Sequence, residues 1–180
     1  VHASGVGDLH LGKPFPAKYL APAAQPEKHY VAGFHADAQT HDGFRFPRVP
    51  VKALFHQGPF HHWFESPKRK QPGPPGPSAR KELAVLAVKA ARGGKPIGWI
   101  VVDRPGPQTA KSIGLGSTLA QVQQAYGPVK LLPNPPSFGR DRCAVNIPGL
   151  KALWVYFKDC RAAKAGGGIT RMSLWLPNKK

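Results

Sequence analysis

Helical spacing of apolar residues is clearest in one short segment of the second half. Its apolar side chains fall on a single helical face: Leu119, Val122 and Tyr126. Thr118, followed three residues later by Gln121, has the spacing of a capping box, and Gly127-Pro128 is a stop signal. The pattern predicts a short helix with a defined beginning and end.

Three segments after this helix have the apolar content and spacing of strands. They are residues 142–147, 150–157 and 169–176, separated by a Pro148-Gly149 turn and by a loop that reaches three consecutive glycines. The second half therefore predicts a helix followed by a three-stranded antiparallel meander.

The first half begins with a weaker version of the same pattern. Residues 13–22 predict at most about two helical turns, because Pro22 ends them. Residues 43–55 alternate apolar and polar side chains, but prolines interrupt the alternation. Since proline cannot donate to a strand ladder, we expect these strands at sheet edges or bends.

Two further apolar segments flank a glycine turn. Residues 82–89 and 96–103 lie on either side of Gly93-Gly94, and their simplest interpretation is a β-hairpin. A helix over residues 82–91 is the competing interpretation, because alanine and leucine favour one.

The segment from His56 to Arg80 differs in composition from its surroundings. It begins with aromatic residues and histidines, continues through a basic triplet, and ends in a proline and glycine run. A run of this kind has no core-forming face, so we expect a projecting basic and aromatic loop over residues 56–80.

Short phrases recur in the same order in the two halves. The matches are Leu11-Gly12 with Leu115-Gly116, Val51–Phe55 with Leu150–Trp154, and Gly93-Gly94 with Gly167-Gly168. The third match requires an insertion in the first half, for which residues 56–80 are the natural place. Duplication of one module is the prediction, and chance similarity of short apolar phrases is the alternative.

These patterns predict an α+β fold of two related modules, each a short helix packed on an antiparallel β-meander. The first module spans residues 1–111 and holds the Pro/Gly-rich insertion, and the second spans residues 112–180. With 20 glycines and 21 prolines in 180 residues, short strands and long loops are favoured over a helical bundle.

The chain is strongly basic, with a formal net charge of +17. Residues 1–65 are almost balanced, whereas residues 66–112 and 113–180 each hold ten basic and two acidic side chains. Such a field attracts acidic proteins, anionic envelope polymers and lipids, and nucleic acid.

Cysteine usage and the absence of long apolar runs indicate a compartment. Cys143 and Cys160 fit neither a zinc pattern nor a redox pair, so we predict one disulfide; two buried thiols are the alternative. No apolar run in the sequence is long enough for a membrane span, and no signal peptide is visible. We expect a mature periplasmic or secreted chain after signal removal.

The phrase Leu115-Gly116-Ser117-Thr118-Leu119, with Val122 following it, leads into the predicted helix and meander. It resembles the BamE-like (SmpA/OmlA) small α/β modules of bacterial envelope proteins. The resemblance covers most of the second half and a degraded copy in the first. It implies a periplasmic or secreted module without catalytic residues.

Two groups of residues suggest metal chemistry. Gly7-Asp8-Leu9-His10 resembles the opening block of calcineurin-type metallophosphoesterases, but no further ligand blocks of that family follow in the sequence. Imidazole and carboxylate groups also crowd together at His35, Asp37, His41 and Asp42. We expect solvated polar loops here, no metal and no other cofactor; a metal-dependent hydrolase is one alternative function.

The predicted binding residues lie in the basic and aromatic loop. They are Phe60, Trp63, Phe64, Lys68, Arg69 and Lys70. The rings would stack on a partner while the cations attract anions, or else the rings close a small core. We therefore expect a non-enzymatic binding or assembly protein that acts at an anionic cell envelope or on an acidic protein. Nucleic-acid binding is the second alternative.

Overall fold

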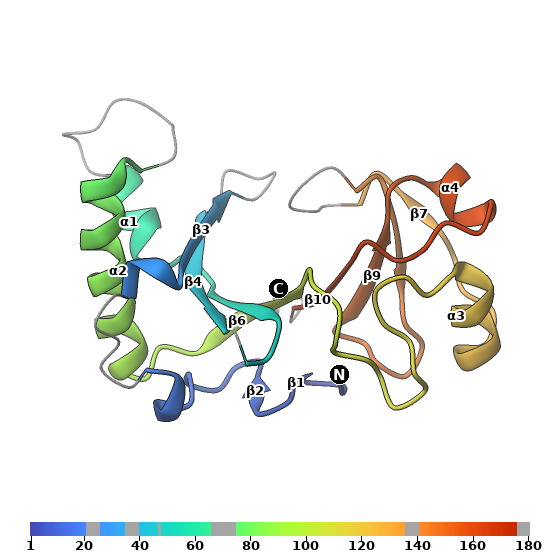
Figure 1. Cartoon of the computed structure of the whole chain (residues 1–180), viewed down its shortest axis with the longest axis horizontal. Coiled ribbons are helices and arrows are strands. Elements are labelled where there is room, and N and C mark those ends of the chain that lie inside the picture. The colour runs from blue at the N-terminus through green and yellow to red at the C-terminus, as the bar shows by residue number, and fades with distance from the viewer. Residues whose placement is uncertain (21–25, 35–39, 47, 66–74, 136–140, 176–180) are drawn as a thin grey trace.

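The chain forms an α+β fold around one large antiparallel sheet (Figure 1). A computed structural model describes residues 1–20, 26–34, 40–46, 48–65, 75–135 and 141–175. The sheet has eight strands in the order β3-β4-β5-β6-β10-β9-β8-β7. Strands of the first half occupy one side of the sheet and strands of the second half occupy the other.

The first half contributes four strands to the sheet and several shorter elements. A hairpin and two 3-10 helices come first: β1 (Gly5–Val6), β2 (Leu9–His10), η1 (Ala17–Tyr19) and η2 (Pro26–Lys28). The sheet strands and helices follow: β3 (Tyr30–Phe34), β4 (Thr40–Phe46), β5 (Val51–Phe55), α1 (Pro59–Glu65), α2 (Pro77–Arg92) and β6 (Ile97–Val102).

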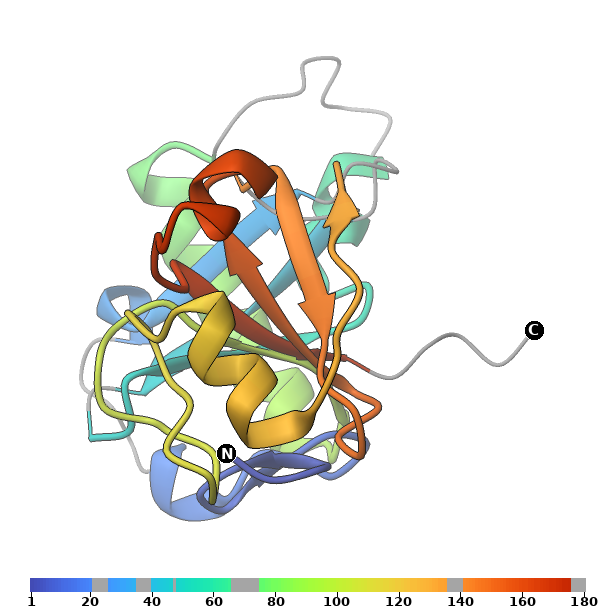
Figure 2. The ribbon, with the colours of Figure 1, turned by 90° about the vertical axis from the view of Figure 1, so that its right-hand side faces the viewer.

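The second half contributes the other four strands and two helices. Its elements are α3 (Leu119–Tyr126), β7 (Leu132–Pro133), β8 (Cys143–Asn146), β9 (Leu153–Phe157), α4 (Cys160–Lys164) and β10 (Arg171–Trp175). Figure 2 views this half end-on, with α3 in front of its strands. The halves join where β10 pairs with β6, with Ser173 opposite Val101.

The predicted helix and meander of the second half are confirmed. Thr118 Oγ1 accepts the Gln121 N–H at 3.3 Å, and the Thr118 N–H donates to Gln121 Oε1 at 2.8 Å, which completes the capping box of α3. Strands β8, β9 and β10 form the meander. Helix α4, between β9 and β10, was not predicted.

Three predictions for the first half are wrong. Residues 82–89 form no hairpin strand but lie in α2, whose buried Leu83, Ala84, Ala87 and Ala91 follow helical spacing. Within the predicted 56–80 loop, residues 59–65 form α1 and the last four residues open α2, while residues 66–74 lie outside the described residues. Strands β4 and β5 are interior strands, because Pro50 lies in the turn between them rather than in a ladder.

Of the helical turns predicted over residues 13–22, the described residues form only the three-residue η1. Pro16 occupies its N-cap in an extended conformation, and no side chain caps it. Few residues therefore remain to form a longer helix before Pro22.

The two faces of the sheet have different chemistry. On the covered face, alternate strand residues such as Phe44, Phe55, Ile100, Val155 and Leu174 join one core that spans both halves. On the opposite face, Leu54, Trp99 and Val101 form a smaller cluster, against which Val31 and Trp175 pack. The period-two alternation of each strand therefore separates the face that forms the main core from a second face, which carries the tryptophans and polar side chains.

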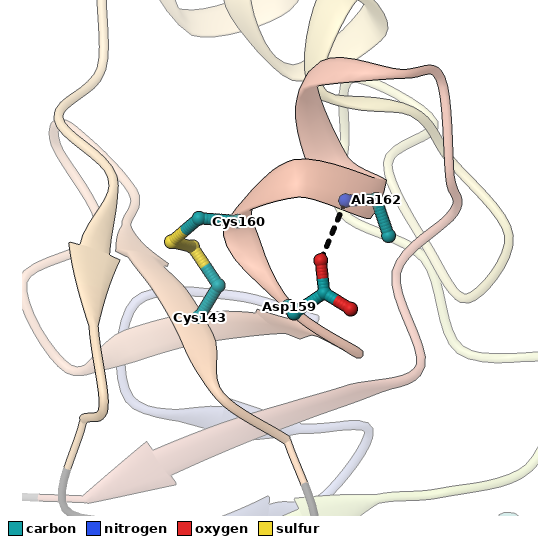
Figure 3. Close-up of a disulfide and its surroundings, with 4 residues drawn as sticks. All are labelled: Cys143, Asp159, Cys160 and Ala162. Atoms are coloured by element: carbon teal, nitrogen blue, oxygen red, sulfur yellow. Dashed lines mark hydrogen bonds between the residues drawn. A yellow bond between two sulfur atoms is a disulfide. The ribbon is translucent and has the colours of Figure 1, made fainter.

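The predicted disulfide is present between Cys143 and Cys160, whose Cα atoms lie 5.0 Å apart. Figure 3 shows it linking β8 to the first residue of α4. The Asp159 side chain caps this helix by accepting the Ala162 N–H at 2.7 Å. The bridge and the cap together fix a helix of only five residues, which is too short to be stable alone.

Matched backbone hydrogen bonds occur in the two halves. Gly12 N–H donates to Ile97 O at 2.7 Å, and Gly116 N–H donates to Ile169 O at 2.9 Å. In return, Ile97 N–H donates to Lys13 O at 2.8 Å and Ile169 N–H donates to Ser117 O at 2.9 Å. In both halves the Leu-Gly phrase thus pairs with the start of the last apolar segment.

These contacts change two of the alignments expected between the halves. Val51 lies opposite Val102, and Leu153 lies opposite Leu174, so β5 corresponds in position to Leu153–Phe157 rather than to Leu150–Trp154. Both strands have the same order of buried and half-buried residues. The equivalence of Ile97 with Ile169 likewise places Gly94 with Gly166, each in the left-handed conformation that favours glycine.

Candidate functional site

A cavity of about 790 Å³ lies between η1, η2, β4 and α2 in the first half. Its volume falls within the roughly 300–1,000 Å³ typical of small-molecule sites. Figure 1 shows α2 running beside β3 and β4 at one end of the sheet. Elements far apart in sequence therefore build this cavity.

Apolar side chains line much of the cavity. Phe44 and Phe46 project from β4, and Leu20 follows η1; all three are buried. Val85 and Val88 project from α2, and Val85 remains 55% exposed. An apolar side chain left this exposed on a helix is available for contact with a bound ligand.

Cations surround these apolar walls. Lys18, Arg48, Lys89 and Arg92 line the cavity and are exposed, and Arg45 also contributes to its lining. Asp8 pairs with Lys18, and Asp103 pairs with Arg45 at 2.9 Å. Among the described residues no carboxylate forms an ion pair with Arg48, Lys89 or Arg92. Three positive charges at this site thus have no carboxylate partner in the part of the chain that the structure describes.

The cations gather toward the η1 end of the cavity. Arg92 Nη2 donates to Leu20 O at 3.3 Å, which brings the end of α2 against η1. Tyr19 contacts Phe46, with ring centroids 4.7 Å apart. Burial, followed by its hydrogen bond to Asp8, raises the pKa of Tyr19 to about 12, and the nearby Arg48 charge opposes that rise. Arg48, Tyr19 and Arg92 therefore mark one end of the site.

The aromatic face of the sheet lies apart from this cavity. The Trp154 and Trp175 rings stack with centroids 6.1 Å apart, and Trp99 lies 6.3 Å from Trp175. Ser173 Oγ donates to the Tyr156 hydroxyl at 3.2 Å, and the Arg171 guanidinium covers the Tyr156 ring at 4.5 Å. These side chains pack against one another across β6, β10 and β9, so we assign this face a structural role.

An ion-pair cluster lies on the same aromatic face. Asp103 accepts two hydrogen bonds from Arg45, at 2.9 and 3.0 Å, and pairs with Lys52 at 2.6 Å. Burial alone would raise the pKa of Asp103, but the hydrogen bonds from Arg45 and Lys52 outweigh it and lower the pKa to about 2. The carboxylate therefore stays ionised and holds Arg45 in place.

The predicted polar cluster includes a buried carboxyl rather than a solvated one. Asp42 Oδ2 accepts the Phe60 N–H at 2.6 Å and the Tyr30 hydroxyl at 3.0 Å, and Asp42 is fully buried. Burial raises the pKa of Asp42 to about 6, although these hydrogen bonds lower it part of the way back. Neighbouring His41 is also buried, and its Nδ1 lies 3.0 Å from Phe55 O.

Metal ligands do not converge in the part of the chain that the structure describes. No group of three or more His, Cys, Asp or Glu side chains there is placed to hold a metal ion. Asp8 instead pairs with Lys18 and accepts the Tyr19 hydroxyl at 2.6 Å, while the His10 ring lies 4.8 Å from His2. His35 and Asp37 lie outside the described residues.

The residues predicted to bind a partner have separate locations. Phe60 is fully buried in the core, and the Trp63 ring stacks on it at 5.5 Å while packing against the core. Burial of Phe60 leaves its ring out of reach of a partner, and the packing of Trp63 agrees with the alternative in which the rings close a small core. Phe64 belongs to α1, but its side chain is not among those described, and Lys68, Arg69 and Lys70 lie outside the described residues. Binding by the basic triplet stays a prediction.

Sequence reasoning missed the cavity because none of its segments forms a motif. One signal was available in α2, where Val85, Val88, Lys89 and Arg92 share a stripe with helical spacing. These four residues fall on one side only if residues 82–91 are interpreted as a helix. The hairpin interpretation does not bring them together.

Comparison with known proteins supports the fold and no more. No family model matches the chain, and no curated protein matches it. Among solved structures, the chain is similar to the uncharacterized protein yfeY from Escherichia coli, with a TM-score of 0.51 and 11% sequence identity. The match covers 98% of this chain and 99% of that chain. The resemblance to BamE-like modules stays a prediction.

The helices were also compared with the requirements of a membrane span. Across the described residues, none of them has both the length and the apolar character needed to cross a bilayer.

Proposed function

We propose that this chain is a non-enzymatic binding protein of the periplasm or the extracellular space, acting at an anionic cell envelope. The observation that carries the proposal is the cavity between η1, η2, β4 and α2. There, apolar walls meet Arg48, Lys89 and Arg92, for which the described residues provide no pairing carboxylate. A cluster of cations beside apolar walls attracts anions more strongly than scattered surface cations do.

The disulfide agrees with the proposed compartment. Disulfides persist in oxidising environments such as the periplasm and the extracellular space, and they are rare where thiols are kept reduced. The Cys143–Cys160 bridge is therefore compatible with a periplasmic or secreted protein.

Binding is favoured over catalysis by the groups that line the cavity. The lining side chains are cationic, apolar or aromatic, with His29 among them, and no carboxylate is among the described lining residues. Such a set lacks a paired acid and base, whereas it suits recognition of a negatively charged ligand.

We also propose that the two halves of the fold descend from one duplicated module. The matched Gly12–Ile97 and Gly116–Ile169 hydrogen bonds support this origin. Strand order supports it as well, because β3-β4-β5-β6 is followed across the sheet by β10-β9-β8-β7. Superposing an experimental structure on itself should equate Gly12 with Gly116, Val51 with Leu153 and Ile97 with Ile169.

Isothermal titration calorimetry tests the binding proposal. We expect octyl phosphate to bind and octyl glucoside, which is neutral, to bind at least about tenfold more weakly. The triple variant Arg48→Gln, Lys89→Gln, Arg92→Gln should weaken octyl phosphate by a similar factor. The triple variant Lys151→Gln, Lys158→Gln, Arg161→Gln makes the same charge change on exposed residues of the second half.

The control variant separates local recognition from net charge. If both triple variants weaken octyl phosphate equally, the overall field of the protein attracts the anion and the cavity is not the site. If neither octyl phosphate nor inorganic phosphate binds the wild-type chain, the proposed function is wrong.

A further inference from the structure

The cavity separates an apolar region from a cationic one along a single helix. Val85 and Val88 precede Lys89 and Arg92 on the side of α2 that lines the cavity. Since a helix rises 1.5 Å per residue, Val85 and Arg92 lie about 10 Å apart along its axis. The C-terminal end of α2 is therefore the cationic end of the site.

The wall formed by β4 also changes from apolar to cationic side chains along its length. Phe44 and Phe46 of β4 supply buried aromatic surface, and Arg48 follows them along the chain. Arg92 contacts Leu20 O, and Tyr19, next in sequence to Leu20, contacts the Phe46 ring. Both walls thus progress from apolar side chains to unpaired cations in the direction of η1.

A ligand that complements both regions has an aliphatic body and an anionic end. The number of cations favours one kind of anion. A phosphate group carries up to two charges and three acceptor oxygens, so Arg48, Lys89 and Arg92 suit it better than they suit a carboxylate. Lys18 is already neutralised by Asp8, so it adds little to this selection.

We propose that the cavity binds a single-chain phospholipid-like amphiphile, with its aliphatic chain between α2 and β4 and its phosphate at Arg48 and Arg92. This inference rests on the proposed function and specifies the ligand of the same site. The chain replaces water over Val85 and Val88 on the side of α2 that faces Phe44 and Phe46, while the phosphate enters the cationic end.

Chain length gives the first test. Calorimetric titrations would use hexyl, octyl and decyl phosphate below their micelle-forming concentrations, with inorganic phosphate and decanoate for comparison. Full burial predicts a gain in affinity of about fourfold per added methylene, so decyl phosphate should bind roughly 15-fold more tightly than octyl phosphate. Decanoate should bind more weakly than decyl phosphate.

Two single variants on α2 provide the matched control. Val85 lines the cavity and is 55% exposed, whereas Leu86 is 42% exposed and is not among the lining residues. Both are surface positions, so serine at either is compatible with folding. Val85→Ser should weaken decyl phosphate several-fold and leave inorganic phosphate unchanged, and Leu86→Ser should affect neither.

The results separate this inference from the broader proposal. Equal affinity for inorganic, hexyl and decyl phosphate, with loss in the Arg48→Gln, Lys89→Gln, Arg92→Gln variant, would retain anion binding and overturn the lipid inference. Equal weakening by Val85→Ser and Leu86→Ser would also overturn it, because the chain would then adsorb to the helix surface. Failure of every anion to bind would reject the proposed function itself.

Discussion

Val101 and Ser173 face each other at the centre of the eight-stranded sheet, where β6 of the first half pairs with β10 of the second. On either side of this pair, Val102 opposes Met172 and Ile100 opposes Leu174. All four of these flanking residues belong to pairs that the proposed duplication aligns: Ile100 with Met172, and Val102 with Leu174. The pairing of β6 with β10 is therefore the pairing that an approximate twofold axis relating the two halves would produce.

This central pairing predicts that the two halves unfold together. One hydrophobic core contains Phe44 from the first half and Val145 from the second, so neither half buries its apolar surface alone. Native-state hydrogen exchange should give the same opening free energy for the amides of Ala53 and Val155, each in the middle of a strand. A clearly lower value in one half would show that this half opens independently.

Stability should depend on the ionisation of Asp42. Its folded-state pKa of about 6 lies above the ordinary value of 3.8, so the stabilisation is fully present below pH 3.8 and is lost as pH rises through about 6. The loss amounts to about 3 kcal/mol, on the scale of 1.36 kcal/mol per pKa unit. Urea unfolding at pH 4 and pH 7.5 measures it.

The Asp42→Asn variant is the control for this titration. Its neutral amide retains an oxygen that can accept from Phe60 N–H and the Tyr30 hydroxyl, but it does not ionise. The wild-type protein should lose about 2.5 kcal/mol more than the variant between the two pH values, because unfolded Asp42 is already half ionised at pH 4. The same pH dependence in both proteins would contradict the assignment to Asp42.

Gly58 should not tolerate a side chain. A Cβ at this position would lie 1.3 Å from Asp42 Oδ1 and 2.4 Å from its Cγ, inside the core. Gly58→Ala should therefore destabilise the fold by about 3 kcal/mol in urea unfolding, as overpacked sites do. Gly76→Ala is a suitable comparison, because nothing lies within 4 Å of a Cβ there; an equal loss at both positions would contradict the steric explanation.

Removing the disulfide should weaken the second half. The bridge joins residues 17 apart, and closing a loop of this size contributes about 3 kcal/mol in the chain-entropy description. The double variant Cys143→Ala, Cys160→Ala should lose about that amount in urea unfolding. Adding a reductant should destabilise the wild-type protein and leave the double variant unchanged; an effect on both would not come from this bridge.

Local sequence signals predicted the second half better than the first. Helix α3 carries both its cap and its stop within ten residues, so no distant contact is needed to recognise it. Strands β8, β9 and β10 were recognisable from their apolar content. In α2, by contrast, alanine, valine and leucine fit both a strand and a helix, and the buried stripe from Leu83 to Ala91 decides between them.

The candidate site depends on contacts that the sequence does not contain. Leu20 and Arg92 meet although they are 72 residues apart, and their contact closes one end of the cavity. The predicted binding residues combine aromatic rings with cations, but Phe60 packs inside the core. Composition predicts an attraction to anions, whereas only the packing of α2 on β4 and η1 places three cations beside apolar walls, with no carboxylate partner in the described part of the chain.

A crystal structure of the protein with decyl phosphate tests the central claim most directly. We predict that the phosphate lies within hydrogen-bonding distance of Arg48 and Arg92, with the alkyl chain along Val85 and Val88. A ligand located instead on the opposite face of the sheet, against Trp99 and Trp175, or a cavity that remains empty at saturating ligand, would contradict the account.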